Sequence, residues 1–366
     1  MLAAGAHVSH HLRECDCHFG FRLNSGLPSS SSSAVVPFPP IWPRKPTSSP
    51  SISHRSQRRG YSFFCSIVPS TAAGEPPILS DCFGYRGGGR EVSVTGGIVA
   101  LGKSDALHVG HRELAIQASK LGSPFLLSFV GIAQVLGWEP RAPVVAQCDR
   151  TRVLSSWAPF CRNMAPSEYQ IQFSSVRHLT PREFVVKLSN ELGVRGVVAG
   201  ESYRFGYKAA GDAAELVKLC NEYGVGAYII KSVMDKNQEA TNSTNSKERG
   251  QVSSTRVRYA LSTGDMKYVS ELLGRRHRLV LMAKDVEGLS YSNSRVSVPR
   301  SCSLNLAPKE GLYDKCFVWS FDQNLIPCRV VIDSSHVHIE LDELATCRHP
   351  VGTDDYISVE FDDEGV

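Results

Sequence analysis

The feature that most constrains this chain is the segment Gly102–His111, which stands between an apolar run and an amphipathic run. The apolar run, residues 94–101, predicts a buried strand, and the run from Arg112 to Leu121 predicts a helix. A turn from a strand into a helix N-terminus suits an anion, because unpaired N–H groups and the positive end of the helix dipole face the ligand. We therefore expect this segment to bind phosphate.

Two histidines flank a glycine there, so that His108, Gly110 and His111 form the pattern H-x-G-H. Imidazole groups can donate hydrogen bonds to oxygens that gain charge during phosphoryl transfer, and Gly110 lets the backbone approach a phosphate. With 12 His and 30 Gly in 366 residues, chance would produce the pattern about 0.03 times per chain. A metal-binding pair is the alternative, but no Cys, Asp or Glu stands at the usual ligand spacing, so we expect no protein-bound metal.

A second candidate phosphate site is the run Ser253-Ser254-Thr255, which is followed by Arg256 and Arg258 and opens a predicted helix. An ordinary N-cap explains Ser253 alone. Three hydroxyl groups and two guanidinium groups together suit a polyphosphate, because hydroxyls donate to single oxygens and a guanidinium spans two.

Composition excludes several classes of protein. Residues 1–70 carry seven cations and two acids, a balance of +5, so the other 296 residues sum to 4 − 5 = −1 and no basic field for nucleic acid is expected. The longest apolar stretch, residues 125–138, is too short to span a membrane. The 11 cysteines contain no C-x-x-C pair, which indicates reduced thiols.

The first 65 residues are rich in serine and poor in acids, with the unbroken run Ser29–Ser33. This composition predicts a disordered transit peptide that directs the protein to the plastid stroma. The alternative is a disordered tail with no targeting function. Residues 66–92 are expected to be a linker.

Buried strands alternate with helices over residues 93–276, which predicts an α/β fold with a Rossmann-like parallel sheet. Thr180, Pro181 and Glu183 give one helix start its N-cap and capping box. Residues 235–250 are expected to be a polar surface loop. Five short strand-like runs from residue 277 onward predict a smaller antiparallel β domain, a barrel or sandwich. The expected strands of the first domain are 94–101, 125–130, 171–173, 194–199 and 226–231, and the expected helices are 112–121, 147–157, 180–192, 212–223, 252–261 and 265–272.

The order strand, H-x-G-H, a second strand ending near Phe129, the segment Gly200–Gly206 and then SST-x-x-R resembles one family. It is similar to the adenylyltransferase module of prokaryotic-type riboflavin kinase/FAD synthetases, here with a plastid leader. The resemblance covers residues 93–276 and implies the transfer of AMP from ATP to FMN, giving FAD and pyrophosphate with Mg²⁺ required. Catalysis would then consist of positioning and charge stabilisation.

The resemblance also implies roles for residues. His108 and His111 would be catalytic. The implied ATP-binding residues are Gly102, Asp105, Gly110, Gly200, Glu201, Ser253, Ser254, Thr255 and Arg258, and the implied flavin-binding residues are Phe129, Tyr203 and Phe205. The first loop departs from the family pattern, since Ser104 replaces an aromatic residue and Lys103 adds a cation.

The part from 277 to 366 resembles a degenerate riboflavin-kinase barrel. Glu340 stands where that family has its catalytic glutamate, but Ser297–Leu304 lacks the Pro-Thr-Ala-Asn signature. We therefore expect FAD synthetase activity without riboflavin kinase activity. Two alternatives remain: a nucleotidyltransferase for another phosphorylated acceptor, and a non-catalytic nucleotide-binding module. The oligomeric state does not follow from the sequence.

Overall fold

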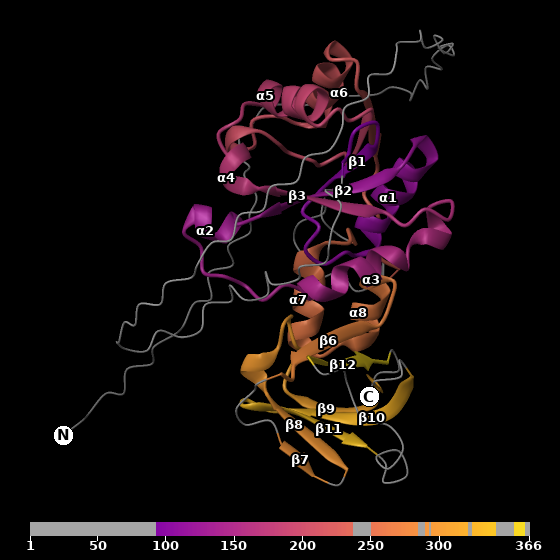
Figure 1. The fold of residues 1–366 in the computed structure, drawn as a ribbon, viewed down its shortest axis with the longest axis vertical. Coiled ribbons are helices and arrows are strands. Elements are labelled where there is room, and N and C mark those ends of the chain that lie inside the picture. The colour runs from indigo at the N-terminus through magenta and orange to yellow at the C-terminus, as the bar shows by residue number, and fades with distance from the viewer. Residues whose placement is uncertain are drawn as a thin grey trace, which may run out of the picture. The chain divides into compact units, whose positions relative to one another are not determined.

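The computed structural model describes residues 93–236, 250–284, 290–292, 294–320, 324–341 and 355–362 (Figure 1). The predicted transit peptide and linker, and the centre of the predicted polar loop at 237–249, lie outside the described residues. Within the described residues, no helix is long and apolar enough to cross a membrane.

The first domain is built on a five-stranded parallel sheet with the strand order β3-β2-β1-β4-β5, as the α/β prediction required. Every side chain of β1 is buried, because helices cover both faces of a parallel sheet. The order reverses beside β1, where β2 lies on one side and β4 on the other. The strands are β1 Ile98–Leu101, β2 Pro124–Val130, β3 Ser167–Gln172, β4 Gly196–Gly200 and β5 Gly226–Ile230.

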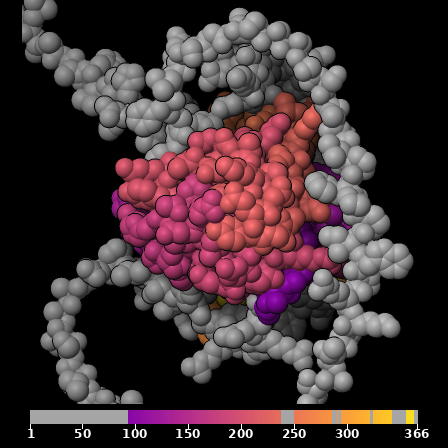
Figure 2. Space-filling model, turned by 90° about the horizontal axis from the view of Figure 1, so that it is seen from above, coloured from indigo at the N-terminus to yellow at the C-terminus, as the bar shows by residue number. Residues whose placement is uncertain are grey.

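Helix α5 starts at its predicted cap. The Thr180 hydroxyl accepts from the N–H of Glu183, and the Glu183 carboxylate accepts from the N–H of Thr180, while Asp212 accepts from the N–H of Glu215 at the start of α6. These helices are α1 Val109–Leu121, α2 Ile132–Leu136, α3 Arg150–Ser155, α4 Phe173–Val176, α5 Pro181–Val186 and α6 Ala213–Glu222. Seen from above, the molecule presents the magenta and salmon segments that contain α4 to α6 (Figure 2).

Several predicted boundaries were wrong, among them the third strand, which runs from Ser167 to Gln172 instead of over 171–173, and the helix expected over 147–157, which is α-helical only over Arg150–Ser155. The first strand begins at Ile98 instead of Val94, because Gly96 adopts a φ of +74° and the N–H of Gly97 donates to the carbonyl of Val94 in a turn. The helix expected over 180–192 is α-helical only to Val186. A π-helical turn then carries the chain to Glu191.

Helices α7 (Ser254–Thr263) and α8 (Met266–Leu273) connect the first domain to a seven-stranded antiparallel sheet. Ser253 and Asp265 cap them. Two short strands in this sheet, β7 and β8, were missing from the prediction. The order is β6-β12-β9-β10-β11-β8-β7, and the strands are β6 His277–Met282, β7 Ser290–Ser292, β8 Arg295–Pro299, β9 Gly311–Trp319, β10 Leu325–Ile332, β11 His336–Leu341 and β12 Tyr356–Phe361.

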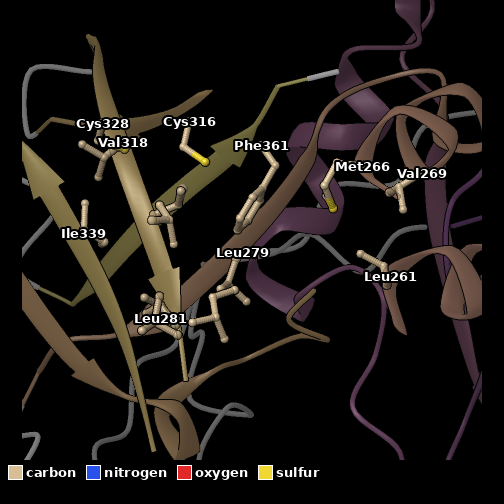
Figure 3. Close-up of a cluster of buried hydrophobic side chains, with 14 of the residues drawn as sticks. Leu261, Met266, Val269, Leu279, Leu281, Cys316, Val318, Cys328, Ile339 and Phe361 are labelled. Carbon is tan, nitrogen blue, oxygen red and sulfur yellow. The ribbon is translucent and has the colours of Figure 1, made fainter. Parts of the chain in front are cut away.

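One apolar core joins α7 and α8 to the antiparallel sheet. Leu261, Met266 and Val269 lie beside Leu279 and Phe361 from the sheet (Figure 3). Ala106, from the H-x-G-H loop, belongs to the same buried cluster. The second domain therefore supports, through α7 and α8, the segments that carry both predicted phosphate sites.

A buried amide adds a polar link between the domains. The Nδ2 group of Asn305 donates to the carbonyls of Val144, at 3.0 Å, and Arg278, at 2.9 Å, and its Oδ1 accepts from the N–H of Val280 at 2.9 Å. Asn305 is 1% exposed, so water cannot replace these bonds.

We predict that Asn305→Ala lowers the free energy of unfolding by about 3 kcal/mol, because it leaves three buried backbone groups unpaired. Urea denaturation followed by circular dichroism measures this change. Asn221→Ala, on the exposed face of α6, is the matched control and should change stability by less than about 0.5 kcal/mol. Equal effects of the two substitutions would contradict the assigned role of Asn305.

Candidate active site

The candidate site lies at the carboxyl ends of the two central strands. Leu101 of β1 is paired with Ala199 of β4, so Gly102 and Gly200 leave the sheet side by side. A methyl group at Gly200 would meet no atom within 4 Å, so this edge is open. Ligands of open α/β sheets bind where the strand order reverses, and this is that position.

The two histidines form the first turn of α1 instead of a loop before it. We expected the helix to begin at Arg112, but it begins at Val109, with His108 as the N-cap and His111 as the third helical residue. The N–H of His111 donates to Nδ1 of His108 at 3.4 Å, and the N–H of His108 donates to Nδ1 of His111 at 3.3 Å. The boundary was misplaced because histidine is not among the usual capping residues.

This reciprocal cap fixes the hydrogen-bonding role of both rings. Because each Nδ1 accepts a backbone hydrogen bond, the proton of each neutral ring must be on Nε2. The rings are stacked with their centroids 3.8 Å apart. Each neutral ring therefore donates through its Nε2–H group, and a backbone hydrogen bond at Lys103 engages the ring of His111.

Both rings are neutral at physiological pH. Burial, followed by the charge of Arg150, lowers the pKa of His111 to about 3, although a backbone hydrogen bond at Lys103 acts in the opposite direction. Burial, then His111 and Arg275, lowers the pKa of His108 well below its usual value. Neutral imidazoles of this kind donate hydrogen bonds to phosphate oxygens without giving up a proton.

The glycine between the histidines sits against the first ring. A Cβ atom at Gly110 would lie 3.0 Å from Cε1 and 3.1 Å from Nδ1 of His108. A Cβ atom at Gly102 would be in ordinary contact with His111, 3.5 Å from its Cδ2. Gly110 thus makes room for the capping imidazole, in addition to the phosphate approach that we expected of it.

The hydroxyl–arginine run lies next to this loop. Arg258 reaches back to Asp105, with Nη2 2.8 Å and Nε 3.2 Å from Oδ2, and so joins segments 153 residues apart. Ser253 is the N-cap of α7 and accepts from the N–H of Arg256, while Ser254 is half-buried and Thr255 is exposed. The two predicted phosphate sites are therefore neighbours in the fold.

The second arginine of the run has another role. Arg256 pairs with the buried carboxylate of Asp235 and donates to the hydroxyl of Tyr268 at 2.8 Å. Tyr268 also donates to Asp235, at 2.6 Å. Arg256 thereby holds the residues before α7 onto α8, which leaves Arg258 as the arginine of this run that faces the histidine loop.

The segment after β4 carries aromatic side chains into one cluster. The rings of Tyr203 and Phe205 are parallel with centroids 6.1 Å apart, and Phe205 lies 5.7 Å from Phe184. Phe129, at the end of β2, lies 6.4 Å from Phe184. The three predicted flavin residues thus come together, around Phe184, which the sequence analysis did not identify because only its helix was recognised.

Members of this cluster differ in exposure. Phe205 is only 5% exposed and belongs to the core, whereas Phe129 and Tyr203 are partly buried at its edge. Burial raises the pKa of the Tyr203 phenol, so that it stays protonated. Glu201, by contrast, is exposed, and its Oε1 accepts from the N–H of Ser232 at 3.0 Å.

One buried ion pair was missed entirely. Arg150 binds Glu168 through two hydrogen bonds of 2.6 and 2.8 Å, and Ser128 donates to the same carboxylate. The Nη2 group of Arg150 also donates to the carbonyl of Ser104 in the histidine loop, at 2.8 Å. No sequence signal marks these contacts, because the partners are 18 to 46 residues apart and belong to no motif.

Metal ligands are sparse. Among the described residues, no group of three or more His, Cys, Asp or Glu side chains could hold a metal ion. Asp105 supplies one carboxylate, which is paired with Arg258 of α7. Magnesium commonly binds through one or two carboxylates together with substrate phosphates, so this donor set fits an ion that arrives with a nucleotide.

In the second domain, Glu340 lies on β11 and pairs with Arg295 of β8, 3.4 Å away. The segment that was compared with a kinase signature forms the end of β8 and the turn after it. Ser297 there bonds to Nδ1 of His338 at 2.8 Å.

Comparison with known proteins gives the same family from both domains. A family model described as FAD synthetase matches residues 166–245, and one described as FAD synthetase 1/2, C-terminal domain, matches residues 276–364. The chain is 52% identical to FAD synthetase 2, chloroplastic, of Arabidopsis thaliana over 95% of this chain and 96% of the relative. It is 57% identical to FAD synthetase 1, chloroplastic, of the same plant over 73% of this chain and 78% of the relative.

Comparison also finds more distant relatives. A bifunctional riboflavin kinase/FMN adenylyltransferase of Listeria monocytogenes is 28% identical over 48% of this chain and 53% of its own. A crystal structure described as a macrolide-efflux protein from Streptococcus pneumoniae aligns with a TM-score of 0.54 and 20% identity, over 74% of this chain and 94% of that one. At this identity the structural match indicates a shared fold alone.

We predict that Gly110→Ala separates stability from activity. Alanine is the better helix former by about 1 kcal/mol, which offsets a similar loss from a displaced His108 cap, so the thermal unfolding midpoint should change little. The added methyl group displaces the His108 ring, so FMN adenylylation, the activity named for the bacterial relative, should slow by about tenfold or more. A rate equal to that of the unaltered protein would mean that the position of the His108 ring does not matter.

Proposed function

The chain belongs to the FAD synthetase family, and we propose that its histidine pair stabilises the charge that forms when the phosphate of FMN attacks the α-phosphate of ATP. The reaction joins AMP to FMN and releases pyrophosphate, so the protein is a nucleotidyltransferase of FAD biosynthesis. Its location is the chloroplast, like that of its Arabidopsis relatives.

The observation that carries this proposal is the reciprocal cap of His108 and His111. It leaves each neutral ring with Nε2–H as its donor, and Nε2 of His111 lies next to Gly102 at the end of β1, 3.8 Å from the place of a Cβ atom there. As an FMN phosphate oxygen bonds to the α-phosphorus, the bond to the bridging oxygen of pyrophosphate breaks, and negative charge leaves the attacking oxygen and grows on that bridging oxygen. Donors that are fixed in advance and shielded from water stabilise such charge. Transfer of a proton is not required, because the FMN phosphate is already ionised.

The leaving pyrophosphate would be held by the N-terminus of α7. Ser253, Ser254 and Thr255 offer hydroxyl groups, and Arg258 offers a guanidinium that already reaches the histidine loop through Asp105. Gly102, Gly110, Gly200 and Glu201 would contact the rest of ATP. Mg²⁺ bound to the triphosphate would neutralise part of the charge on the leaving group, and Asp105 is the carboxylate placed to assist in holding it.

The flavin would bind at the aromatic cluster. Phe129 and Tyr203 offer partly exposed rings at the open edge, and Phe205 supports Tyr203 from the core. Aromatic side chains stack on a planar ring system with offset geometry. A different phosphorylated acceptor is the alternative, because the histidine loop and α7 recognise ATP and not the acceptor.

We also propose that residues 93–276 carry the synthetase activity and that residues 277–366 have no riboflavin kinase activity. In support, Ser297–Leu304 contains no threonine or asparagine that could join Glu340 in holding a metal and a phosphate. Residues 1–65 would serve as the transit peptide and 66–92 as a linker.

Paired assays test the activity. Purified protein is incubated with Mg²⁺·ATP and either FMN or riboflavin, and the products are separated by chromatography. We expect FAD from FMN and no FMN from riboflavin. Nicotinamide mononucleotide and phosphopantetheine serve as alternative acceptors. Absence of FAD together with adenylylation of either of these would reject FMN as the acceptor, and FMN formed from riboflavin would reject the absence of kinase activity.

A second experiment tests the histidine pair. His111→Ala should lower kcat for FAD formation by about 10² to 10³-fold, because one fixed donor to the developing charge is lost. His178→Ala, at an exposed position outside the site, is the matched control and should leave kcat unchanged. If the two variants have the same kcat while both remain folded, His111 has no catalytic role.

A further inference from the structure

The loop that carries His108 is held from behind by two arginines. The carbonyls of Ser104 and Asp105 accept from Arg150, at 2.8 and 3.4 Å. The carbonyls of Ala106 and Leu107 accept from Arg275, at 3.1 and 2.6 Å. Four successive carbonyls of this loop are therefore bound by guanidinium groups.

The last of these carbonyls belongs to a strained residue. Leu107 has a φ of +46°, in the left-handed region that residues with a side chain rarely occupy. It is fully buried and immediately precedes the N-cap His108. Such a conformation persists where surrounding contacts hold it, and the 2.6 Å bond from Arg275 is the shortest hydrogen bond to this loop.

Arg275 comes from far away in the sequence. It follows Gly274, the C-cap of α8, and lies 168 residues beyond Leu107. A third hydrogen bond, to the carbonyl of Leu273 at 3.2 Å, holds the guanidinium against the end of α8. Within the described part of the chain its acceptors are all backbone carbonyls, whereas Arg150 also has the carboxylate of Glu168. Arg275 therefore fixes one end of α8 to the turn that sets the direction of the histidines.

We propose that Arg275 is a positioning residue for adenylyl transfer, which holds Ala106 and Leu107 so that the Nε2–H group of His108 points at the reacting phosphate. This inference rests on the proposed function of the histidine pair. Arg275 does not touch the substrate in this proposal. It acts through the loop, and its planar fork, which spans two adjacent carbonyls, is the feature that lysine cannot reproduce.

The charge of Arg275 has a separate effect. The charged and titratable groups that act on His108 are His111 and Arg275, which lower its pKa, and Asp105, which raises it. Burial, with neighbouring arginines, lowers the pKa of Arg275 itself to about 9, so it remains a cation at pH 7. Removing this cation should therefore raise the pKa of His108. If activity needs the neutral ring, the fall of activity with decreasing pH should then begin at a higher pH than in the unaltered protein.

The test uses two substitutions in the full chain. Arg275→Lys keeps the charge and loses the fork, and Arg275→Gln loses both. We expect Arg275→Lys to lower kcat for FAD formation by about 30-fold or more, with the KM values for ATP and FMN changed less than about threefold. The acid limb of its kcat–pH profile should stay in place. In Arg275→Gln the rate should fall as well, and the acid limb should move to higher pH.

Arg276 supplies the matched control. It is the next residue in the chain and is also partly buried. Its guanidinium pairs with Asp362 at 2.9 Å and stacks on the ring of Phe317, and neither partner belongs to the histidine loop. Arg276→Lys and Arg276→Gln should keep the kcat and the pH profile of the unaltered protein. Thermal unfolding of all four variants shows whether each is folded.

Measuring His111→Ala in the same series separates this inference from the proposed function. If His111→Ala is as fast as the unaltered protein, the assigned site is wrong. If His111→Ala is slow but folded Arg275→Lys keeps its kcat, the positioning role of Arg275 is overturned. The role is also overturned if both Arg275 variants fail to fold while the Arg276 variants fold, because Arg275 would then serve stability alone.

Discussion

The site depends on one local interaction, the exchange of backbone hydrogen bonds between the imidazoles of His108 and His111. The exchange completes the first turn of α1, and it occupies Nδ1 of both rings. Burial then makes protonation unfavourable, so each ring keeps a single donor at Nε2. The helix start, the tautomer and the charge state thus have the same physical origin.

Arginine side chains lie near these neutral rings and bind the backbone carbonyls of the loop. Arg150 and Arg275 lie behind the loop, and Arg258 lies beside it through Asp105. In a buried site, charges interact more strongly than in water, so these cations favour an anionic substrate while they keep the histidines unprotonated. This division suits a reaction in which charge moves between phosphate oxygens and no proton needs to be transferred.

The antiparallel domain contributes to the site through packing. Its core continues into α7 and α8, and Asn305 ties it to Val144, next to the residues that support the loop. Loss of packing in the second domain would therefore loosen both phosphate-binding segments. This gives the domain a structural function that does not need the Glu340 carboxylate, which is engaged by Arg295.

The sequence by itself determined the strands of the parallel sheet, the capped starts of α5 and α7, and the two motifs that we propose to contact phosphate, because these depend on apolar runs and on residues close together in the chain. Tertiary structure decided the rest. Asp105 and Arg258 are 153 residues apart, Arg275 binds a carbonyl 168 residues away, and Phe184 joins rings from three segments. Contacts of this kind arise only when the fold brings distant segments together, and neither periodicity nor spacing contains that information. The early start of α1 was missed for a different reason, since a histidine cap becomes visible only when the two rings are seen to face each other's backbone.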